Sequence, residues 1–137
     1  MTPAQARERF AGAEVARLAS VGRDGRPHIV PIVFALDGET IYSVVDEKPK
    51  RTLRLKRVEN LRERAAAAVL ADHYEHDWGR LWWVRADGRA RVLDAGEDEA
   101  QRAVALLAAR HPQQRAAGVV LAVDVERWTG WSAADAE

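Results

Sequence analysis

Residues 27–45 read PHIVPIVFALDGETIYSVV, and this stretch decides the fold because it predicts two antiparallel strands joined by a tight turn. Its first part, residues 27–36, is rich in β-branched residues, which favour strands. Asp37-Gly38 predicts a type I′ turn, and residues 40–45 form the returning strand. Pro31 lacks the backbone N–H that a sheet ladder needs, so its strand is expected at a sheet edge, or bulged or broken there.

Strand patterns continue on both sides of this hairpin. Residues 15–21 alternate as a half-buried strand should, and residues 22–25 predict a turn. Asp87-Gly88 predicts the turn of a second hairpin. The further predicted strands cover residues 15–21, 66–71, 81–86, 89–93 and 119–125.

Three segments carry helix signals. Thr2, Pro3 and Gln5 form an N-cap, a first-turn proline and a capping-box partner, which predicts a helix over residues 3–11. A second helix, which Thr52 would cap, lies within residues 48–64, and a third runs from Glu97 to His111. The connections are too short for βαβ crossovers. The sequence therefore predicts one domain over residues 1–137, mostly β with appended helices, closed as an antiparallel barrel.

Composition narrows the function. The 137 residues include 21 basic and 21 acidic side chains, so no global charge favours nucleic acid or an anionic membrane. The absence of cysteine excludes disulfides, thiolate metal sites and a cysteine nucleophile. The N-terminus lacks the apolar region of a signal peptide, and no segment approaches about 18 consecutive apolar residues. We expect a cytoplasmic protein with no membrane or nucleic-acid partner.

Positive charge is concentrated in residues 48–64, which hold eight basic and two acidic residues, a net charge of +6. Such a patch on a neutral chain favours a compact polyanion over a long polymer. Lys48, Lys50 and Arg51 precede a helix start, where backbone N–H groups also favour phosphate. The alternative is a solvated helical face with surface ion pairs. Because the patch follows the strand end at residues 43–46, a planar ring against the strand would bring a phosphate tail to the bases.

The histidines give weaker signals. His73 and His76 lie among carboxylates that could bind a metal, but their spacing matches no HExxH, facial-triad or EF-hand pattern, so a solvated loop is favoured and no metal is expected. His28 is predicted to be a hydrogen-bonded strand histidine, and His111 a cation at a helix C-terminus.

Two adjacent tryptophans indicate a partner surface. Trp82 and Trp83 must point to opposite faces of one strand. One of them can enter the core, and the other is left for a partner subunit, a ligand or partial solvent.

Four stretches together resemble a known family: residues 16–31, 46–52, 72–84 and 123–131. They are similar to small proteins of the pyridoxamine-phosphate-oxidase class that are assigned as F420-dependent enzymes, the deazaflavin branch of the flavin-reductase-like split β-barrels. The resemblance implies a split β-barrel of the FMN-binding type, with an antiparallel Greek-key barrel. It also implies a homodimer with two cofactor sites at the subunit interface, and hydride transfer between coenzyme F420 and a small organic substrate.

The resemblance further implies which residues bind the cofactor. The deazaflavin ring would be lined by Pro31, Ile32, Val33, Ser43 and Val44. The phosphate and oligoglutamate tail would meet Lys48, Lys50, Arg51 and Thr52, helped by Lys56, Arg57 and Asn60. The hairpin would bring in Trp78 and Arg80, across the dimer. No catalytic residue is assigned.

Two rivals stay open. The first is an FMN-binding protein like pyridoxamine-phosphate oxidase, which differs only in cofactor. A tail of several carboxylates needs more positive charge than one phosphate, which favours F420. The second is a non-catalytic F420-binding carrier, whose fold and basic patch would look the same. The chain departs from many relatives in a longer loop after Ser43 and in Arg64-Ala65-Ala66-Ala67, where an Asn-Pro pair is common.

Overall fold

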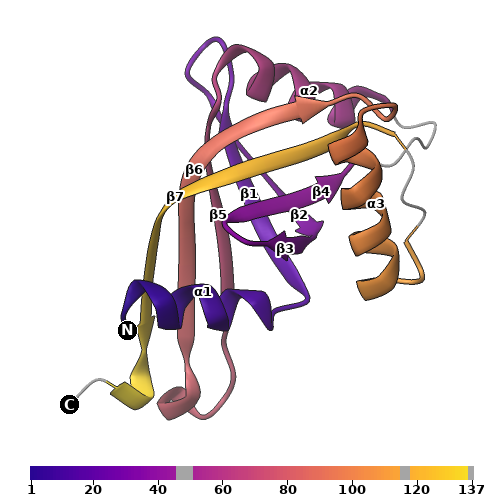
Figure 1. Cartoon of the computed structure of the whole chain (residues 1–137). Coiled ribbons are helices and arrows are strands. Elements are labelled where there is room, and N and C mark those ends of the chain that lie inside the picture. The colour runs from indigo at the N-terminus through magenta and orange to yellow at the C-terminus, as the bar shows by residue number, and fades with distance from the viewer. Residues whose placement is uncertain (46–50, 115–117, 136–137) are drawn as a thin grey trace.

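The computed structural model describes residues 1–45, 51–114 and 118–135, with the backbone alone for residues 51–55. Within this part, one seven-stranded antiparallel sheet carries three helices (Figure 1). The strands are β1 (Val15–Val21), β2 (Pro27–Val33), β3 (Ala35–Asp37), β4 (Thr40–Val44), β5 (Ala66–His73), β6 (Trp82–Leu93) and β7 (Val120–Ser132). The helices are α1 (Pro3–Ala11), α2 (Arg51–Glu63) and α3 (Asp98–Arg110), with short 3-10 turns η1 (Trp78–Arg80) and η2 (Ala133–Asp135). The predicted mostly β fold with appended helices is confirmed.

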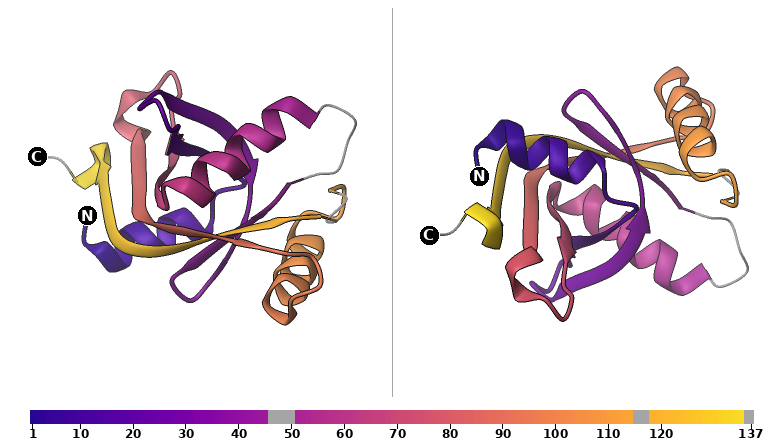
Figure 2. Two further views of the ribbon diagram at one scale, coloured as in Figure 1. Left: turned by 90° about the horizontal axis from the view of Figure 1, so that it is seen from above. Right: turned by 90° about the horizontal axis from the view of Figure 1, so that it is seen from below.

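The sheet curls because its two edges share one stretch of chain. The strand order is β2-β1-β5-β6-β7-β4-β3, so β2 and β3 lie at opposite edges. Only Phe34 separates the end of β2 from the start of β3, and its side chain is fully buried. The edges must therefore meet at Phe34, which rolls the sheet into the half-barrel seen end-on in Figure 2. The edge position predicted for the strand with Pro31 is confirmed.

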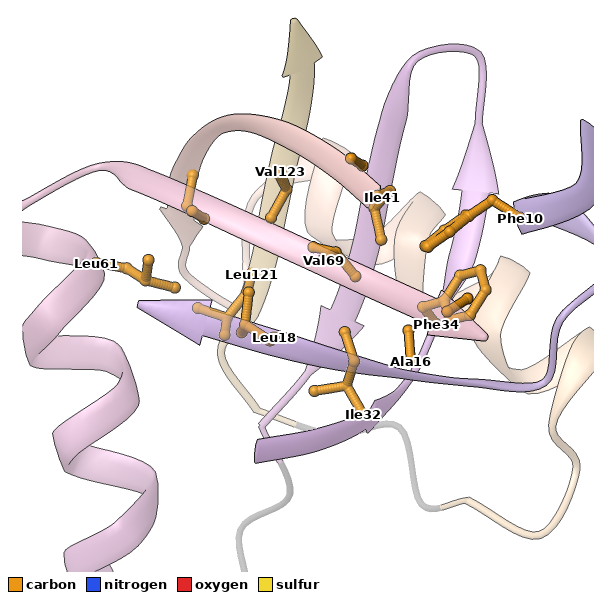
Figure 3. Packing of buried hydrophobic residues seen from close by; sticks show 14 of the residues in the cluster. Phe10, Ala16, Leu18, Ile32, Phe34, Ile41, Leu61, Val69, Leu121 and Val123 are labelled. Atoms are coloured by element: carbon orange, nitrogen blue, oxygen red, sulfur yellow. The ribbon is translucent and has the colours of Figure 1, made fainter. Parts of the chain in front are cut away.

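The main hydrophobic cluster fills the concave side of this sheet. Side chains from β1, β2, β4, β5 and β7 point toward one another there (Figure 3). Phe10 of α1 packs against Phe34, with ring centroids 4.5 Å apart, while α2 contributes Val58 and Leu61. In Figure 1, α2 lies at the upper end of the curled sheet and α1 lies nearer its lower end. Both helices thus cover the barrel core rather than its outside.

A second cluster lies under α3, and a polar network ties that helix to the sheet. The Arg91 guanidinium donates to Glu99 at 2.7 Å and to Asp124 at 2.6 Å. Tyr42 donates its hydroxyl to Glu99 at 2.7 Å. The hydrogen bond from Arg91 lowers the pKa of Glu99 to about 2, whereas burial, and then Glu99, raise the pKa of Tyr42 to about 12. The network therefore holds its members in fixed charge states near neutral pH.

The predicted second hairpin is wrong. Residues 82–93 form one continuous strand, β6, which pairs along its whole length with β7. Asp87-Gly88 marks a register shift in this ladder instead of a turn. At Gly88 a Cβ atom would overlap the carbonyl oxygen of Asp124 on β7. An Asp-Gly pair suits a turn and a close backbone approach equally well, and only the partner strand distinguishes the two.

The first hairpin exists, but its turn differs from the prediction. Asp37 pairs with Thr40, so the two turn residues are Gly38 and Glu39. Gly38 has a φ of +60°, and no non-glycine residue in the described chain has a positive φ. A type I′ turn needs positive φ at both turn residues, so this turn has the sign pattern of type II′. The predicted long strand also divides into β2 and β3 at Phe34.

The three predicted helices are confirmed, but the predicted cap of α2 is wrong, because this helix begins at Arg51 and Thr52 is its second residue. The capping box of Thr2 and Gln5 is formed at the start of α1. Helix α3 begins after Glu97 and ends before His111. In the described ranges, none of the helices combines the length and the apolar character that crossing a bilayer requires.

Candidate functional site

The inner face of α2 packs polar side chains onto the β1–β2 end of the sheet. Asn60 is buried and donates its Nδ2 to the Oγ of Ser20 on β1, at 3.3 Å. Arg57 precedes Asn60 by three residues, so the two share one face of the helix. Arg57 is accordingly half-buried, although it belongs to the most basic segment of the chain.

Arg57 is a partly buried cation, and no acidic side chain pairs with it in the described part of the chain. Its Nε is buried and has no hydrogen-bond partner, and none of the ion pairs within residues 1–45, 56–114 and 118–135 includes it. Burial lowers the pKa of this guanidinium. Arg23 shows the contrast, because it donates to both carboxylate oxygens of Glu63, at 2.6 and 3.2 Å. An unpaired buried charge costs free energy, which a bound anion would recover.

A surface cavity of about 450 Å³ lies beside this helix face. Lys56 contributes an exposed ammonium group to it. The cavity is lined by Arg23, Lys56, Glu59, Asn60, Arg62 and Glu63. Of the predicted tail-binding residues, Lys56 and Asn60 are therefore brought to one cavity, with Arg57 on the same helix.

The remaining predicted tail-binding residues lie at or before the start of α2. Arg51 and Thr52 are the first two residues of the helix, whose backbone alone is described at this point. Lys48 and Lys50 lie outside the described residues. Their predicted contact with a phosphate stays a prediction.

The three predicted ring-lining residues of β2 point to different sides of the sheet. Pro31 is exposed, Ile32 is buried in the main cluster and Val33 is half-buried. Strand alternation explains this pattern. Ile32 would therefore offer its backbone rather than its side chain to a ring on the outer face.

The two predicted ring-lining residues of β4 also point to opposite faces. Both are buried, but Val44 belongs to the cluster under α3, whereas its neighbour Ser43 faces the other side. Only the side chain of Ser43 is thus directed toward the barrel side of the sheet.

Trp78 and Arg80 lie far from α2 within one chain. Strand β5 begins just after α2 and ends just before η1, which carries both residues, so an eight-residue strand separates the two ends (Figure 1). At 3.3 Å per residue this is roughly 25 Å. Trp78 is 74% exposed, and Arg80 pairs with Glu75 at 3.3 Å. Glu75 also lies 2.6 Å from His73, so Glu75 joins two side chains of the predicted loop.

His28 is a polar residue whose role the sequence did not reveal. It was predicted to be satisfied by hydrogen bonds, but its Nδ1 is buried and has no partner. Burial, and then the charges of Arg57 and Lys56, lower the pKa of the imidazole. Its position in the strand could have indicated the burial, since residues 28, 30 and 32 alternate with exposed residues and face the inner side of the sheet.

A second surface lies on the outer face of the sheet. Ile29 is 64% exposed and Tyr74 is 67% exposed on this face, and Arg17 pairs with Asp72 at 3.6 Å. They border a shallow hollow of about 450 Å³. It is lined by Arg17, Ala19, Ile29, Ala68, Leu70, Asp72, Tyr74, Trp83 and Arg85. Large apolar side chains that cluster in the open mark a contact surface.

The sequence pattern of the pyridoxamine 5'-phosphate oxidase family matches residues 2–132, nearly the whole chain. The chain belongs to this family. The family assignment agrees with the curled antiparallel sheet, and it confirms the coarse part of the resemblance drawn from the sequence. No curated protein matches the chain in sequence.

Solved structures share the family fold at low sequence identity. The conserved protein Rv2991 from Mycobacterium tuberculosis has a TM-score of 0.77 at 18% identity, over 98% of this chain and 86% of that one. A FAD-binding protein from Mesorhizobium loti has a TM-score of 0.71 at 20% identity, over 95% and 92%. The heme storage protein HutZ from Vibrio cholerae has a TM-score of 0.69 at 14% identity, over 96% and 95%. At these identities the likeness establishes the split β-barrel fold alone.

Proposed function

We propose that this chain is an F420-dependent oxidoreductase, which transfers hydride between the reduced deazaflavin and a small organic electrophile. The observation that carries the proposal is Arg57, a half-buried guanidinium whose buried Nε has no hydrogen-bond partner and which has no described carboxylate partner. Membership in a family named for a phosphate-bearing substrate supports an anionic ligand at this helix.

The residues present fit an anionic cofactor tail. Arg57 offers a buried donor for a phosphate. The cavity on the same helix is lined by three cations, Arg23, Lys56 and Arg62, and by the carboxylates of Glu59 and Glu63, so its net positive charge would attract further carboxylates only weakly. Bound F420 supplies the hydride from C5 of its reduced ring. The tasks of the polypeptide are to anchor the tail, to hold the ring against the sheet and to keep water from the reacting faces.

A flavin is the second candidate, and a relative favours it. The Mesorhizobium loti protein of the same fold binds FAD. A flavin mononucleotide has one phosphate, which Arg57 and one neighbour would neutralise, so the remaining charge of the +6 segment would be unused. The heme storage protein HutZ shares this fold, and a storage protein of the same fold is the reason to test a carrier role as well.

Parallel titrations of the purified protein with F420, FMN and FAD test the proposal. We expect F420 to bind at least about tenfold more tightly than either flavin, a difference of about 1.4 kcal/mol. Tight flavin binding without F420 binding would replace the proposal by the flavin alternative. Oxidation of reduced F420 with quinones, enones and tetrapyrroles then separates an enzyme from a carrier, because a carrier binds F420 without turnover.

We further propose that the protein is a homodimer whose interface is the outer sheet face around Ile29, with the cofactor sites at that interface. The face combines apolar side chains with charges of both signs, Arg17 and Arg85 beside Asp72. A surface that carries both signs is complementary to a second copy of itself across a two-fold axis. A partner seated there would also bring its own η1, with Trp78 and Arg80, toward a site that these residues do not reach within one chain.

Ile29→Glu should convert the dimer to a monomer without unfolding it. The side chain is 64% exposed in the single chain, so glutamate meets solvent there, whereas it would bury a charge in the dimer. Leu106→Glu on α3 is the matched control, because Leu106 is an exposed apolar residue away from this face, and it should leave the dimer intact. Sedimentation velocity gives the mass, and circular dichroism checks the fold. A wild-type monomer, or an I29E protein that stays dimeric, would refute this interface.

A further inference from the structure

The backbone register places His28 directly under α2. His28 on β2 is paired with Ser20 on β1, and directly opposed residues of antiparallel strands point to the same face of a sheet. The Oγ of Ser20 accepts the hydrogen bond from Asn60 of α2, so this face is the one that α2 covers. Arg57 lies on the same side of α2 as Asn60. His28 and Arg57 therefore face each other across the junction of helix and sheet.

This junction contains two buried polar atoms without hydrogen-bond partners, and it carries an excess of positive charge. His28 Nδ1 and Arg57 Nε are both buried without a hydrogen-bond partner. Burial has the largest effect on the imidazole and lowers its pKa. The charges of Arg57 and Lys56 on α2 lower it further. From β1 the facing group is the uncharged Ser20, and in the turn between β1 and β2, Asp24 lies 4.0 Å from Arg26. In native proteins, two neighbouring buried polar atoms rarely lack hydrogen-bond partners unless a ligand or a water binds between them.

We propose that His28 is a second contact for the anion that Arg57 holds, and that the imidazole takes up a proton when the anion binds. This inference rests on the proposed function, since the anion is the phosphate of the cofactor tail. The proton comes from solvent and adds to the imidazole, whose N–H then donates to a phosphate oxygen. In the free protein, burial and then the two adjoining cations lower the pKa of the imidazole, and a bound anion reverses the sign of the local field.

The direction of the pH effect follows from the charges. In the free protein the pKa of His28 lies below its usual value, and a neighbouring phosphate raises it. The complex therefore binds more protons than the free protein between these two pKa values, and affinity must rise as the pH falls through that interval. Above the pKa of the complex, the affinity does not depend on this group.

Coenzyme F420 is the probe, and its phosphodiester and its carboxylates keep their charge above about pH 5.5. The hydroxyl of its ring titrates near neutral pH, so the wild-type profile is compared with that of each variant, which shares this ionisation. We expect the affinity of the wild-type protein to rise about fivefold to tenfold between about pH 8 and pH 6, with proton uptake detected by calorimetry in two buffers of different ionisation enthalpy. His28→Gln should lack this rise, so that the two proteins bind F420 with similar affinity at about pH 8 and differ about fivefold to tenfold at about pH 6. His76→Gln, which replaces an exposed histidine, should keep the wild-type profile.

The possible outcomes separate the two claims. F420 binding with a flat wild-type profile, or with the same slope in the His28→Gln variant, overturns the role of His28 and leaves the proposed function standing. A failure of F420 to bind at any pH overturns the proposed function and this inference with it. Loss of the slope in the His28→Gln variant alone, with unchanged thermal stability, supports the inference, since a purely structural histidine would alter stability instead.

Discussion

Arg57→Met should weaken F420 binding by about 30-fold to 100-fold while leaving the free protein at least as stable as before. A buried charge-assisted hydrogen bond to phosphate contributes up to about 3 kcal/mol, and the expected change in affinity corresponds to about 2.0–2.8 kcal/mol of that. The free protein loses only a half-buried guanidinium without a described carboxylate partner, and methionine fills similar volume without that charge. Fluorescence titration measures the affinity, and urea unfolding measures the stability.

Arg102→Met is the matched control, because it removes the same charge from an exposed position on α3. It should change F420 affinity less than about twofold at moderate salt. If the two variants bind F420 equally well, the anion does not sit at Arg57. If Arg57→Met unfolds the free protein, the guanidinium has a structural role instead.

The second large effect concerns the shift in the β6–β7 ladder. Gly88→Ala should lower the free energy of unfolding by about 3 kcal/mol or more, because the added Cβ would overlap the carbonyl oxygen of Asp124 and lie 3.1 Å from the Cα of Val125. These are backbone atoms of a paired strand, so they cannot turn aside as a flexible side chain would. Urea denaturation of the free protein measures the loss.

Gly96→Ala provides the comparison. A Cβ at Gly96 meets nothing within 4 Å, and the stability should change by less than about 0.5 kcal/mol. Equal stabilities of the two variants would show that β6 and β7 can accommodate a Cβ atom at position 88. The close backbone contact would then not be the reason for a glycine there.

Local signals in the sequence predicted most elements of the fold. The capping box of Thr2 and Gln5 marked α1, and the alternation of residues 15–21 marked β1 with its bounds. The error at Asp87-Gly88 has a physical reason. A glycine that allows a close backbone contact cannot be distinguished in a single sequence from a glycine that forms a turn. The strand that makes the contact, β7, is more than thirty residues away in the chain.

The candidate site was only partly predictable for a similar reason. The basic segment identified Lys56 and Arg57 as members of one charged group, but their different burial depends on how α2 packs on β1. Trp78 and Arg80 matched a family pattern, yet one chain holds them at the far end of β5 from α2. His28 appeared isolated in the sequence because Arg57, its charged neighbour, arrives through tertiary packing.

Alternate residues of β7 serve the two hydrophobic clusters in turn: Leu121 and Val123 pack in the barrel, while Val120 and Ala122 pack under α3. If β7 leaves the sheet, both clusters lose residues, so neither cluster can unfold independently of the other. Heating should accordingly yield one calorimetric transition whose van't Hoff and calorimetric enthalpies agree. The amide protons of residues 120–123 should exchange with deuterium only through global opening, and so report the total stability of the molecule.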